Sequence, residues 1–255
     1  MSRSHPLNSI LLGALIAALV VGGIVWLLSL ERAAQVARQD PASPITASVA
    51  PDPVAAAPDA AAPSSADAIA SRADHGWLTA VAQATGIPQR ALAAYAGAQL
   101  RLAEEAPNCG IGWNTLAGIG RIETVHGTYG GSSIDADGVA APPILGIQLD
   151  GSSSAVINDS DGGALDGDAE WDRAVGPMQF IPDTWSRWGA DGNADGRADP
   201  HQIDDAALSA ARYLCASGDV RGAENWRAAI FSYNHSEKYV TDVAEAANLY
   251  AERLG

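Results

Sequence analysis

An uncharged run near the N-terminus most constrains what this chain can fold into. From Ser9 to Leu30 there is no acidic or basic side chain, and most residues are Leu, Ile, Val, Ala or Gly. A helix needs about 20 such residues to cross the hydrocarbon core of a bilayer, whereas the apolar part of a cleaved signal peptide has roughly 7–15. We therefore predict a single-pass signal-anchor over residues 9–30, after a short cytoplasmic segment, residues 1–8. Cleavage after the run is the alternative.

A segment with the composition of a linker follows this run. Residues 31–70 are rich in Ala, Pro and Ser with scattered Asp, as in Ala62-Pro63-Ser64-Ser65. Such a tract buries little apolar surface, so we expect a disordered, extended tether to a domain over residues 71–255. Arg3 before the run and Arg32 after it leave its orientation undecided. The order of anchor, tether and domain favours a cell-membrane protein whose domain lies outside the cytoplasm.

Charge and cysteine content narrow the function classes further. The formal net charge of −15 argues against nucleic acid as a partner, because phosphate binding needs a basic surface. An acidic surface suits a secreted domain that meets carbohydrate or divalent cations. The two cysteines, Cys109 and Cys215, both lie in the predicted domain. A disulfide is their natural pairing outside the cytoplasm, and two buried free thiols are the alternative.

Hydrophobic periodicity predicts that the domain is mainly α-helical. Apolar residues recur at helical spacing before Gly86, from Leu92 to about Glu105, and from Trp113 to Glu123. The same spacing predicts a short helix with Trp185 and Trp188, and three C-terminal helical stretches that carry Leu208–Leu214, Trp226–Tyr233 and Tyr239–Tyr250.

Residues 128–172 interrupt this helical pattern. They are rich in Gly, Asp and Ser and predict a long Gly/Asp-rich loop insertion, without a convincing pair of strands anywhere in the chain. The run Asp159–Asp168 lacks a single register for a metal-binding loop, and we interpret it as a solvated loop.

Glu123 is the first candidate for a catalytic residue. It ends the apolar run from Trp113, and a Gly- and Ser-rich loop, residues 126–133, follows at once. A carboxyl group that leaves a buried helix for a cleft is desolvated, so its pKa rises and it can donate a proton near neutral pH. A solvated glutamate at the end of a helix is the alternative.

Three segments in order now resemble one family. They are residues 119–127 (Ile-Gly-Arg-Ile-Glu-Thr-Val-His-Gly), 174–182 (Ala-Val-Gly-Pro-Met-Gln-Phe-Ile-Pro) and 231–236 (Phe-Ser-Tyr-Asn-His-Ser). Together they resemble the soluble domain of the membrane-bound lytic murein transglycosylase B family in its actinobacterial form. The resemblance covers roughly Trp77 to the C-terminus. It implies a lysozyme-like fold and an enzyme that cleaves the bond between N-acetylmuramic acid (MurNAc) and N-acetylglucosamine (GlcNAc), leaving a 1,6-anhydro end.

The resemblance also implies roles for individual residues. By motif match, Glu123 is the single acid and base, and Gln179 lines the glycan cleft. Tyr233 and Asn234 face the reacting sugar, with Tyr239 further along the same helix. The alternatives are that Gln179 caps a turn and that both tyrosines are core aromatics.

A single glutamate is compatible with this chemistry, without a cofactor. Ordinary glycosidases use two carboxylates, but substrate-assisted enzymes do not. Here the N-acetyl oxygen of the substrate can stabilise the cationic carbon, and its 6-hydroxyl can attack. Two other functions stay open, a hydrolytic muramidase and a non-catalytic peptidoglycan-binding protein of the envelope.

An Asp-rich turn is the second candidate site. Asp191, Asn193 and Asp195 occupy the first, third and fifth places of an EF-hand loop, Gly196 the sixth, and the carbonyl of Arg197 the seventh. The twelfth place holds Gln202 instead of Glu. The family resemblance suggests a longer loop that Asp205 closes, and hence a structural Ca²⁺. An Asp/Asn/Gly turn with an Asp helix cap needs no metal and is the alternative.

Overall fold

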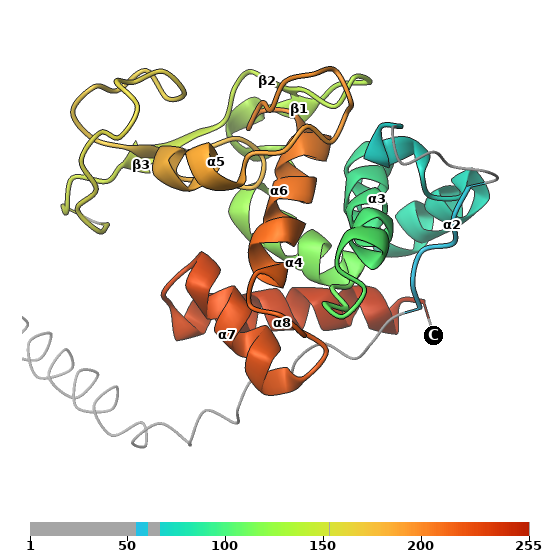
Figure 1. Cartoon of the computed structure of the whole chain (residues 1–255). Helices are drawn as coiled ribbons and strands as arrows, with labels where there is room; N and C mark the ends of the chain where they lie inside the picture. The colour runs from blue at the N-terminus through green and yellow to red at the C-terminus, as the bar shows by residue number, and fades with distance from the viewer. Residues whose placement is uncertain (1–54, 61–66, 153, 255) are drawn as a thin grey trace, which may run out of the picture. The chain divides into compact units, whose positions relative to one another are not determined.

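The computed structural model describes residues 55–60, 67–152 and 154–254 (Figure 1). The predicted anchor and most of the predicted linker lie outside these residues. Within them, none of the helices combines the length and hydrophobicity that a membrane crossing requires.

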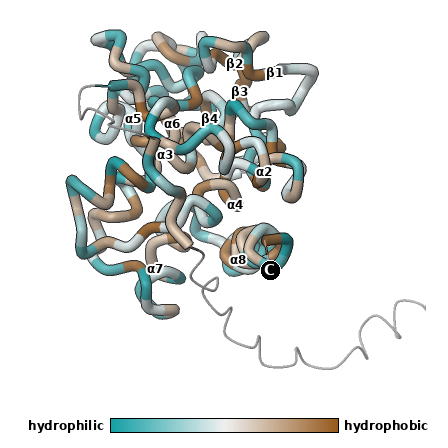
Figure 2. Tube along the Cα trace, turned by 90° about the vertical axis from the view of Figure 1, so that its right-hand side faces the viewer, coloured by the Kyte–Doolittle hydropathy of each residue, from teal (hydrophilic) through white to brown (hydrophobic). Residues whose placement is uncertain are grey.

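The described part is mainly helical, as the periodicity predicts. Its helices are α2 (His75–Thr85), α3 (Gln89–Glu105), α4 (Trp113–Thr124), α5 (Pro182–Trp188), α6 (Ile203–Cys215), α7 (Ala223–Tyr233) and α8 (Glu237–Glu252), with the 3₁₀ turns η1 (Ile69–Ser71) and η2 (Tyr129–Gly131). Hydrophobic and hydrophilic residues mix along the helices (Figure 2), although α3, α4 and α6 each contain a run of consecutive buried residues and are therefore covered on more than one face.

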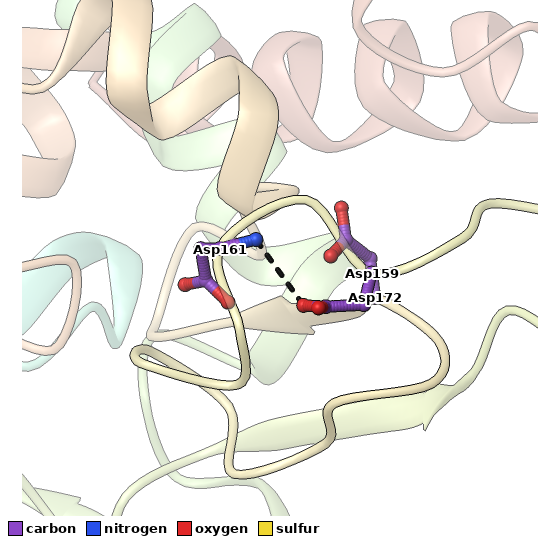
Figure 3. Close-up of side chains that lie close together, drawn as sticks. All are labelled: Asp159, Asp161 and Asp172. Carbon is purple, nitrogen blue, oxygen red and sulfur yellow. Dashed lines mark hydrogen bonds between the residues drawn. The ribbon is translucent and has the colours of Figure 1, made fainter.

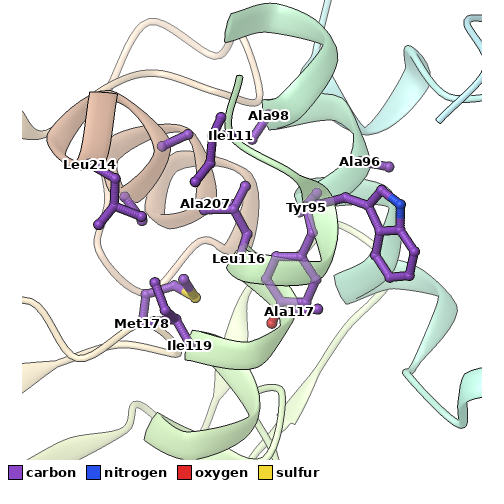
Figure 4. Close-up of a cluster of buried hydrophobic side chains, with 14 of the residues drawn as sticks. Tyr95, Ala96, Ala98, Ile111, Leu116, Ala117, Ile119, Met178, Ala207 and Leu214 are labelled. Carbon is purple, nitrogen blue, oxygen red and sulfur yellow. The ribbon is translucent and has the colours of Figure 1, made fainter. Parts of the chain in front are cut away.

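Helix α4 lies at the centre of this arrangement. It packs most extensively against α8 and also contacts α3, which in turn packs against α6. Leu116 and Ile119 of α4 are fully buried beside Tyr95 of α3 and Met178 (Figure 4). The helix that carries Glu123 is therefore held from several sides.

Two glycines of α4 allow its neighbours to come close. A Cβ at Gly118 would lie 2.9 Å from the carbonyl oxygen of Val243 in α8, and one at Gly120 would lie 2.1 Å from the hydroxyl of Tyr95. Both distances are too short for a real Cβ. The glycine spacing of the Glu123 helix thus reflects the close approach of α8 and Tyr95.

Two short antiparallel strand pairs lie in and beside the Gly/Asp-rich insertion, so the expectation of no strand pair was wrong. β1 (Ser133–Ile134) pairs with β2 (Ala140–Ala141). β3 (Leu145–Gln148) pairs with β4 (Arg173–Val175), with an irregular register between Leu145 and Gln148. Strands of two to four residues are too short for a period-2 pattern to stand out in the sequence.

Packing also reaches residues that the sequence analysis assigned to the linker. Ile69 is fully buried in the core and Ala57 is almost fully buried. Asp59 forms an isolated bridge with Ala73. The last part of the Ala/Pro-rich tract therefore packs on the domain, because it supplies apolar side chains at these positions.

One disulfide and one ion pair tie distant segments together. Cys109 and Cys215 are bonded, which confirms the predicted disulfide between the segment before α4 and the end of α6. Arg90 of α3 contacts both carboxylate oxygens of the buried Asp204 in α6, at 2.7 and 2.6 Å. The same guanidinium donates to the carbonyl oxygens of Ala136 and Asp137, so it also holds the β1–β2 turn.

Candidate active site

Glu123 is the next-to-last residue of α4 and is only partly exposed. Its Oε1 accepts a hydrogen bond of 2.5 Å from the hydroxyl of Tyr239. Burial raises the pKa of Glu123 to about 7, although the Tyr239 hydrogen bond opposes the rise. Glu123 can therefore hold and release a proton near neutral pH, and the solvated alternative is not what the structure shows.

Two tyrosines, Tyr239 and Tyr233, lie near the carboxyl group of Glu123. The rings of Tyr239 and Tyr233 are parallel within 4°, with centroids 6.4 Å apart. The hydroxyl of Tyr233 donates to the carbonyl oxygen of Met178 at 2.8 Å. Burial, and then the negative charge of Glu123, raise the pKa of both phenols well above its usual value, so both stay neutral.

Tyr233 and Tyr239 do not share a helix, contrary to the expectation from the sequence. α7 ends at Tyr233, and α8 begins at Glu237 with Ser236 as its N-cap. Asn234 lies in this break, extended and exposed. The break turns the chain, which lets the two rings stack face to face.

Gln179 sits in a strained turn between β4 and α5. Its φ is 50°, a left-handed value that is uncommon for residues other than glycine. Both its backbone N–H and its side-chain Nε2 donate to the carbonyl oxygen of Gly176, at 3.1 and 2.9 Å. The side chain thus does bond within the turn, as the turn-cap alternative expected. Such strain clusters at functional sites.

A pocket of about 300 Å³ lies beside this group of residues. Gln179 and Tyr233 both line it, whereas Glu123 and Tyr239 do not. Tyr239 nevertheless connects the two, because its ring stacks on Tyr233 and its hydroxyl bonds Glu123. The other lining residues come from four parts of the chain and are Ile157, Phe180, Ile181, Asp183, Thr184, Tyr213, Ser232 and His235. The predicted site residues Gln179, Tyr233, Tyr239 and Glu123 are therefore brought together.

Within the described part of the chain, no second carboxylate is among the groups that shift the pKa of Glu123. The carboxylate that lines the pocket belongs to Asp183, which is exposed and forms an ion pair with Arg187. Because Asp183 is exposed and already paired with Arg187, it is poorly suited to act with Glu123 as a second catalytic carboxylate. The arrangement offers one proton donor and acceptor, Glu123, amid neutral polar groups.

Comparisons with protein families and with solved structures each give a match. Residues 157–228 match the family described as Transglycosylase SLT domain. Glu123 lies outside this matched segment. Among solved structures, the chain is similar to the Escherichia coli lytic transglycosylase Slt35 in complex with bulgecin A, at 16% identity and a TM-score of 0.45, over 70% of this chain and 79% of that one. A search of curated proteins finds no match.

Two residues that follow Glu123 hold the end of α4, and the sequence analysis gave neither a role. The hydroxyl of Thr124 donates to the carbonyl oxygen of Pro177 at 2.7 Å and accepts from the N–H of Gly127 at 2.8 Å. This links α4 to the turn that carries Gln179.

The buried His126 contacts the hydroxyls of Tyr95 and Tyr250, at 3.3 and 2.8 Å. Burial lowers the pKa of His126 to about 4, so the ring is neutral and structural.

The predicted calcium loop has its carboxylates turned onto backbone N–H groups. Asp191 accepts from Asp195 and Gly196, and Asp195 accepts from Arg197. Asp205 of α6 accepts from Gly192, Asn193 and Asp199, at 2.7, 3.1 and 2.8 Å. Burial, with a smaller effect of the Asp191 charge, raises the pKa of Asp205 to about 6.

The run Asp159–Asp168 is not the solvated loop that the sequence analysis expected. Asp166 is buried and accepts from the N–H groups of Asp168 and Arg173. Oxygens of Asp159, Asp161 and the fully buried Asp172 lie within 4.8 Å of one another (Figure 3), the one such acidic group in the part of the chain that the structure describes. These three carboxylates could hold a metal ion. Asp172 already accepts two hydrogen bonds from Ser160.

Proposed function

We propose that the chain is a peptidoglycan lytic transglycosylase with a lysozyme-like fold. It cleaves the β-1,4 bond between MurNAc and GlcNAc and leaves a 1,6-anhydroMurNAc end. The observation that carries this proposal is the setting of Glu123, a partly buried carboxyl group that accepts a hydrogen bond from Tyr239 and whose pKa is raised by burial to about 7. The match of residues 157–228 to the Transglycosylase SLT domain supports the same class.

In the first step, protonated Glu123 donates its proton to the glycosidic oxygen as the bond from that oxygen to C1 of MurNAc breaks. A pKa near the working pH suits this role. The N-acetyl carbonyl oxygen of MurNAc bonds to C1 and spreads the positive charge. Gln179 and Asn234, which are polar but uncharged, orient the N-acetyl group without a competing acid.

In the second step, ionised Glu123 takes the proton of the MurNAc 6-hydroxyl, whose oxygen attacks C1 and displaces the N-acetyl oxygen. Glu123 is then protonated again, and no water is consumed. The hydrogen bond from Tyr239 stabilises the ionised form between the two steps.

Mass analysis of the products tests this function. Sacculi digested with the purified domain should release muropeptides with anhydro ends, one water lighter than those of a muramidase. Hydrated reducing ends would instead assign a muramidase, in which Glu123 activates water. Binding of sacculi without any product would leave a peptidoglycan-binding protein.

We also propose that the domain lies outside the cytoplasm on a single-pass anchor at residues 9–30. The disulfide between Cys109 and Cys215 supports an oxidising compartment. Protease added to intact spheroplasts should release the domain, and protection of the domain would contradict this topology.

A structural Ca²⁺ completes the proposal. Asp191, Asn193, Asp195, the Arg197 carbonyl and Asp205 offer the hard oxygen donors that Ca²⁺ prefers, and the buried Asp205 beside Asp191 is a pair of like charges that a cation would neutralise. The ion would fix the turn before α6 and would take no part in the reaction.

A further inference from the structure

One wall of the pocket comes from the Gly/Asp-rich insertion. Of the residues of that insertion that the structure describes, only Ile157 is among those that line the pocket. Its N–H donates to the carbonyl oxygen of Leu149 at 2.8 Å, and its carbonyl oxygen accepts from the N–H of Asp172 at 3.1 Å. The backbone of Ile157 is therefore held on both sides, although it belongs to neither strand pair.

Aromatic rings from the helical part of the domain form the other apolar surface of the pocket. Tyr213 and Phe180 each contact Tyr233 edge to face, with centroids 5.7 and 5.8 Å away. The hydroxyls of Tyr213 and Tyr233 donate to backbone carbonyl oxygens, so these two side chains offer the pocket mainly the apolar parts of their rings. In Figure 1 the loop that follows β3 lies beside α5, on the left of the view, and α7 lies below both.

The composition and size of the pocket suit one sugar residue. Apolar surface from Ile157 and the rings is combined with a few polar groups, among them Gln179, Thr184 and His235. A volume of about 300 Å³ is at the lower end of the range for ligand pockets. A sugar presents apolar C–H faces and polar edges, which matches this combination.

We propose that the insertion forms one wall of a sugar subsite, in which Ile157 packs against the C–H face of an N-acetylhexosamine of the glycan strand. We place that sugar next to the one whose bond is cut, because Glu123 does not line the pocket but bonds Tyr239, whose ring stacks on the pocket-lining Tyr233. Ile157 then determines affinity for the glycan and takes no part in the proton transfers. The proposal rests on the proposed function, because it takes the glycan strand as substrate.

The neighbouring Val156 provides a matched control. It is 64% exposed and belongs to the same loop, but it does not line the pocket. If the insertion bound glycan through its exposed apolar surface in general, Val156 would matter as much as Ile157.

The test compares Ile157→Asp, Ile157→Trp and Val156→Asp in the Glu123→Gln background and in the wild-type background. Calorimetry with peptide-free glycan strands gives the Kd of each Glu123→Gln protein, and digestion of the same strands gives KM and kcat. We expect Ile157→Asp to weaken binding and raise KM about tenfold with kcat within threefold, since each tenfold step corresponds to a free energy typical of one partly buried apolar side chain. Ile157→Trp should weaken binding by filling the pocket, and Val156→Asp should leave Kd and KM unchanged.

Several outcomes would overturn the proposal. An unchanged Kd in both Ile157 variants, or an equal loss of affinity in Val156→Asp, would contradict the role of Ile157 in a sugar subsite. A fall in kcat with unchanged KM, or an absence of glycan binding by the parent protein, would contradict it as well. Melting temperatures within a few degrees of the parent show that the variants are folded. Hydrated reducing ends from the wild type would refute the transglycosylase function and leave the binding comparison to decide the subsite.

Discussion

The hydroxyl of Tyr239 lies 2.5 Å from Oε1 of Glu123, so a residue of α8 bonds the carboxyl group at the end of α4. The two residues are 116 positions apart in the sequence. Their contact depends on the close packing of α8 against α4 at Gly118. The ionisation of Glu123, the proposed catalytic acid, therefore depends on the packing of α8 against α4.

Tyr239→Phe should shift the pH dependence of the reaction. The Tyr239 hydrogen bond lowers the pKa of Glu123, so its loss raises that pKa and moves the basic limb of the kcat/KM profile to higher pH. The optimum rate should fall roughly 10- to 100-fold, because a hydrogen bond to a charged group contributes ~1.5–3 kcal/mol. Tyr250→Phe is the control, since it removes the hydroxyl of another buried tyrosine of α8 that bonds His126 instead. Equal profiles for the wild type and Tyr239→Phe would refute this role.

Glu123→Gln should stabilise the domain at alkaline pH. The folded-state pKa of about 7 lies above the ordinary value of 4.5, so the folded state binds the proton more tightly, and stability falls as pH rises from 4.5 to 7. The glutamine avoids this loss, on the order of 2 kcal/mol at pH 8 after allowance for partial exposure. Urea unfolding at pH 4 and pH 8 measures it. An equal difference between the two proteins at both pH values would contradict the raised pKa.

The helices and the desolvated setting of Glu123 could be predicted from the sequence, but the contacts around Glu123 could not. The spacing of Leu92, Tyr95 and Leu100 follows from local helical geometry. The contact of Tyr239 with Glu123 joins different helices, and periodicity gives no information on which residues meet. The strand pairs escaped detection because each strand is short, and Ile157 escaped because its loop shows no pattern at all.

The turn at residues 125–127 is another feature that the sequence analysis did not predict. Val125 and His126 both have positive φ, at 52° and 60°, which is uncommon outside glycine and least expected for a β-branched residue such as Val125. The hydrogen bonds of His126 to two tyrosines from α3 and α8 hold this conformation. Only the tertiary structure supplies those partners, so the sequence reads as a simple Gly-rich loop.

Arg90→Met should strongly destabilise the domain. It leaves the carboxylate of Asp204 buried without its cation, which typically costs 3–5 kcal/mol. Lys238→Met is the matched control, because the Lys238–Asp242 pair is exposed and such pairs contribute about 0–1 kcal/mol. Denaturant unfolding of both variants gives the comparison. A similar decrease in the free energy of unfolding of the two variants would show that the Arg90–Asp204 pair stabilises the domain no more than an exposed ion pair does.

Ca²⁺ should raise the melting temperature of the chelator-treated domain. Binding to the folded state alone adds about 2.7 kcal/mol of stability when the free ion is at 100 times its Kd. Asp195→Asn should weaken the effect if the loop before α6 holds the ion, whereas Asp161→Asn should not. A shift that Asp161→Asn abolishes would move the site to the group of Asp159, Asp161 and Asp172, and no shift at all would show that neither loop binds Ca²⁺.

The rate at which anhydro-ended muropeptides form from sacculi, compared between the wild type and Glu123→Gln, tests the central claim most directly. Glu245→Gln, an exposed substitution on α8, serves as the control. We predict that the wild type and the control release anhydro products at similar rates, and that Glu123→Gln is 10²–10⁴-fold slower while it still binds the glycan. Undiminished release of anhydro products by Glu123→Gln would contradict the account.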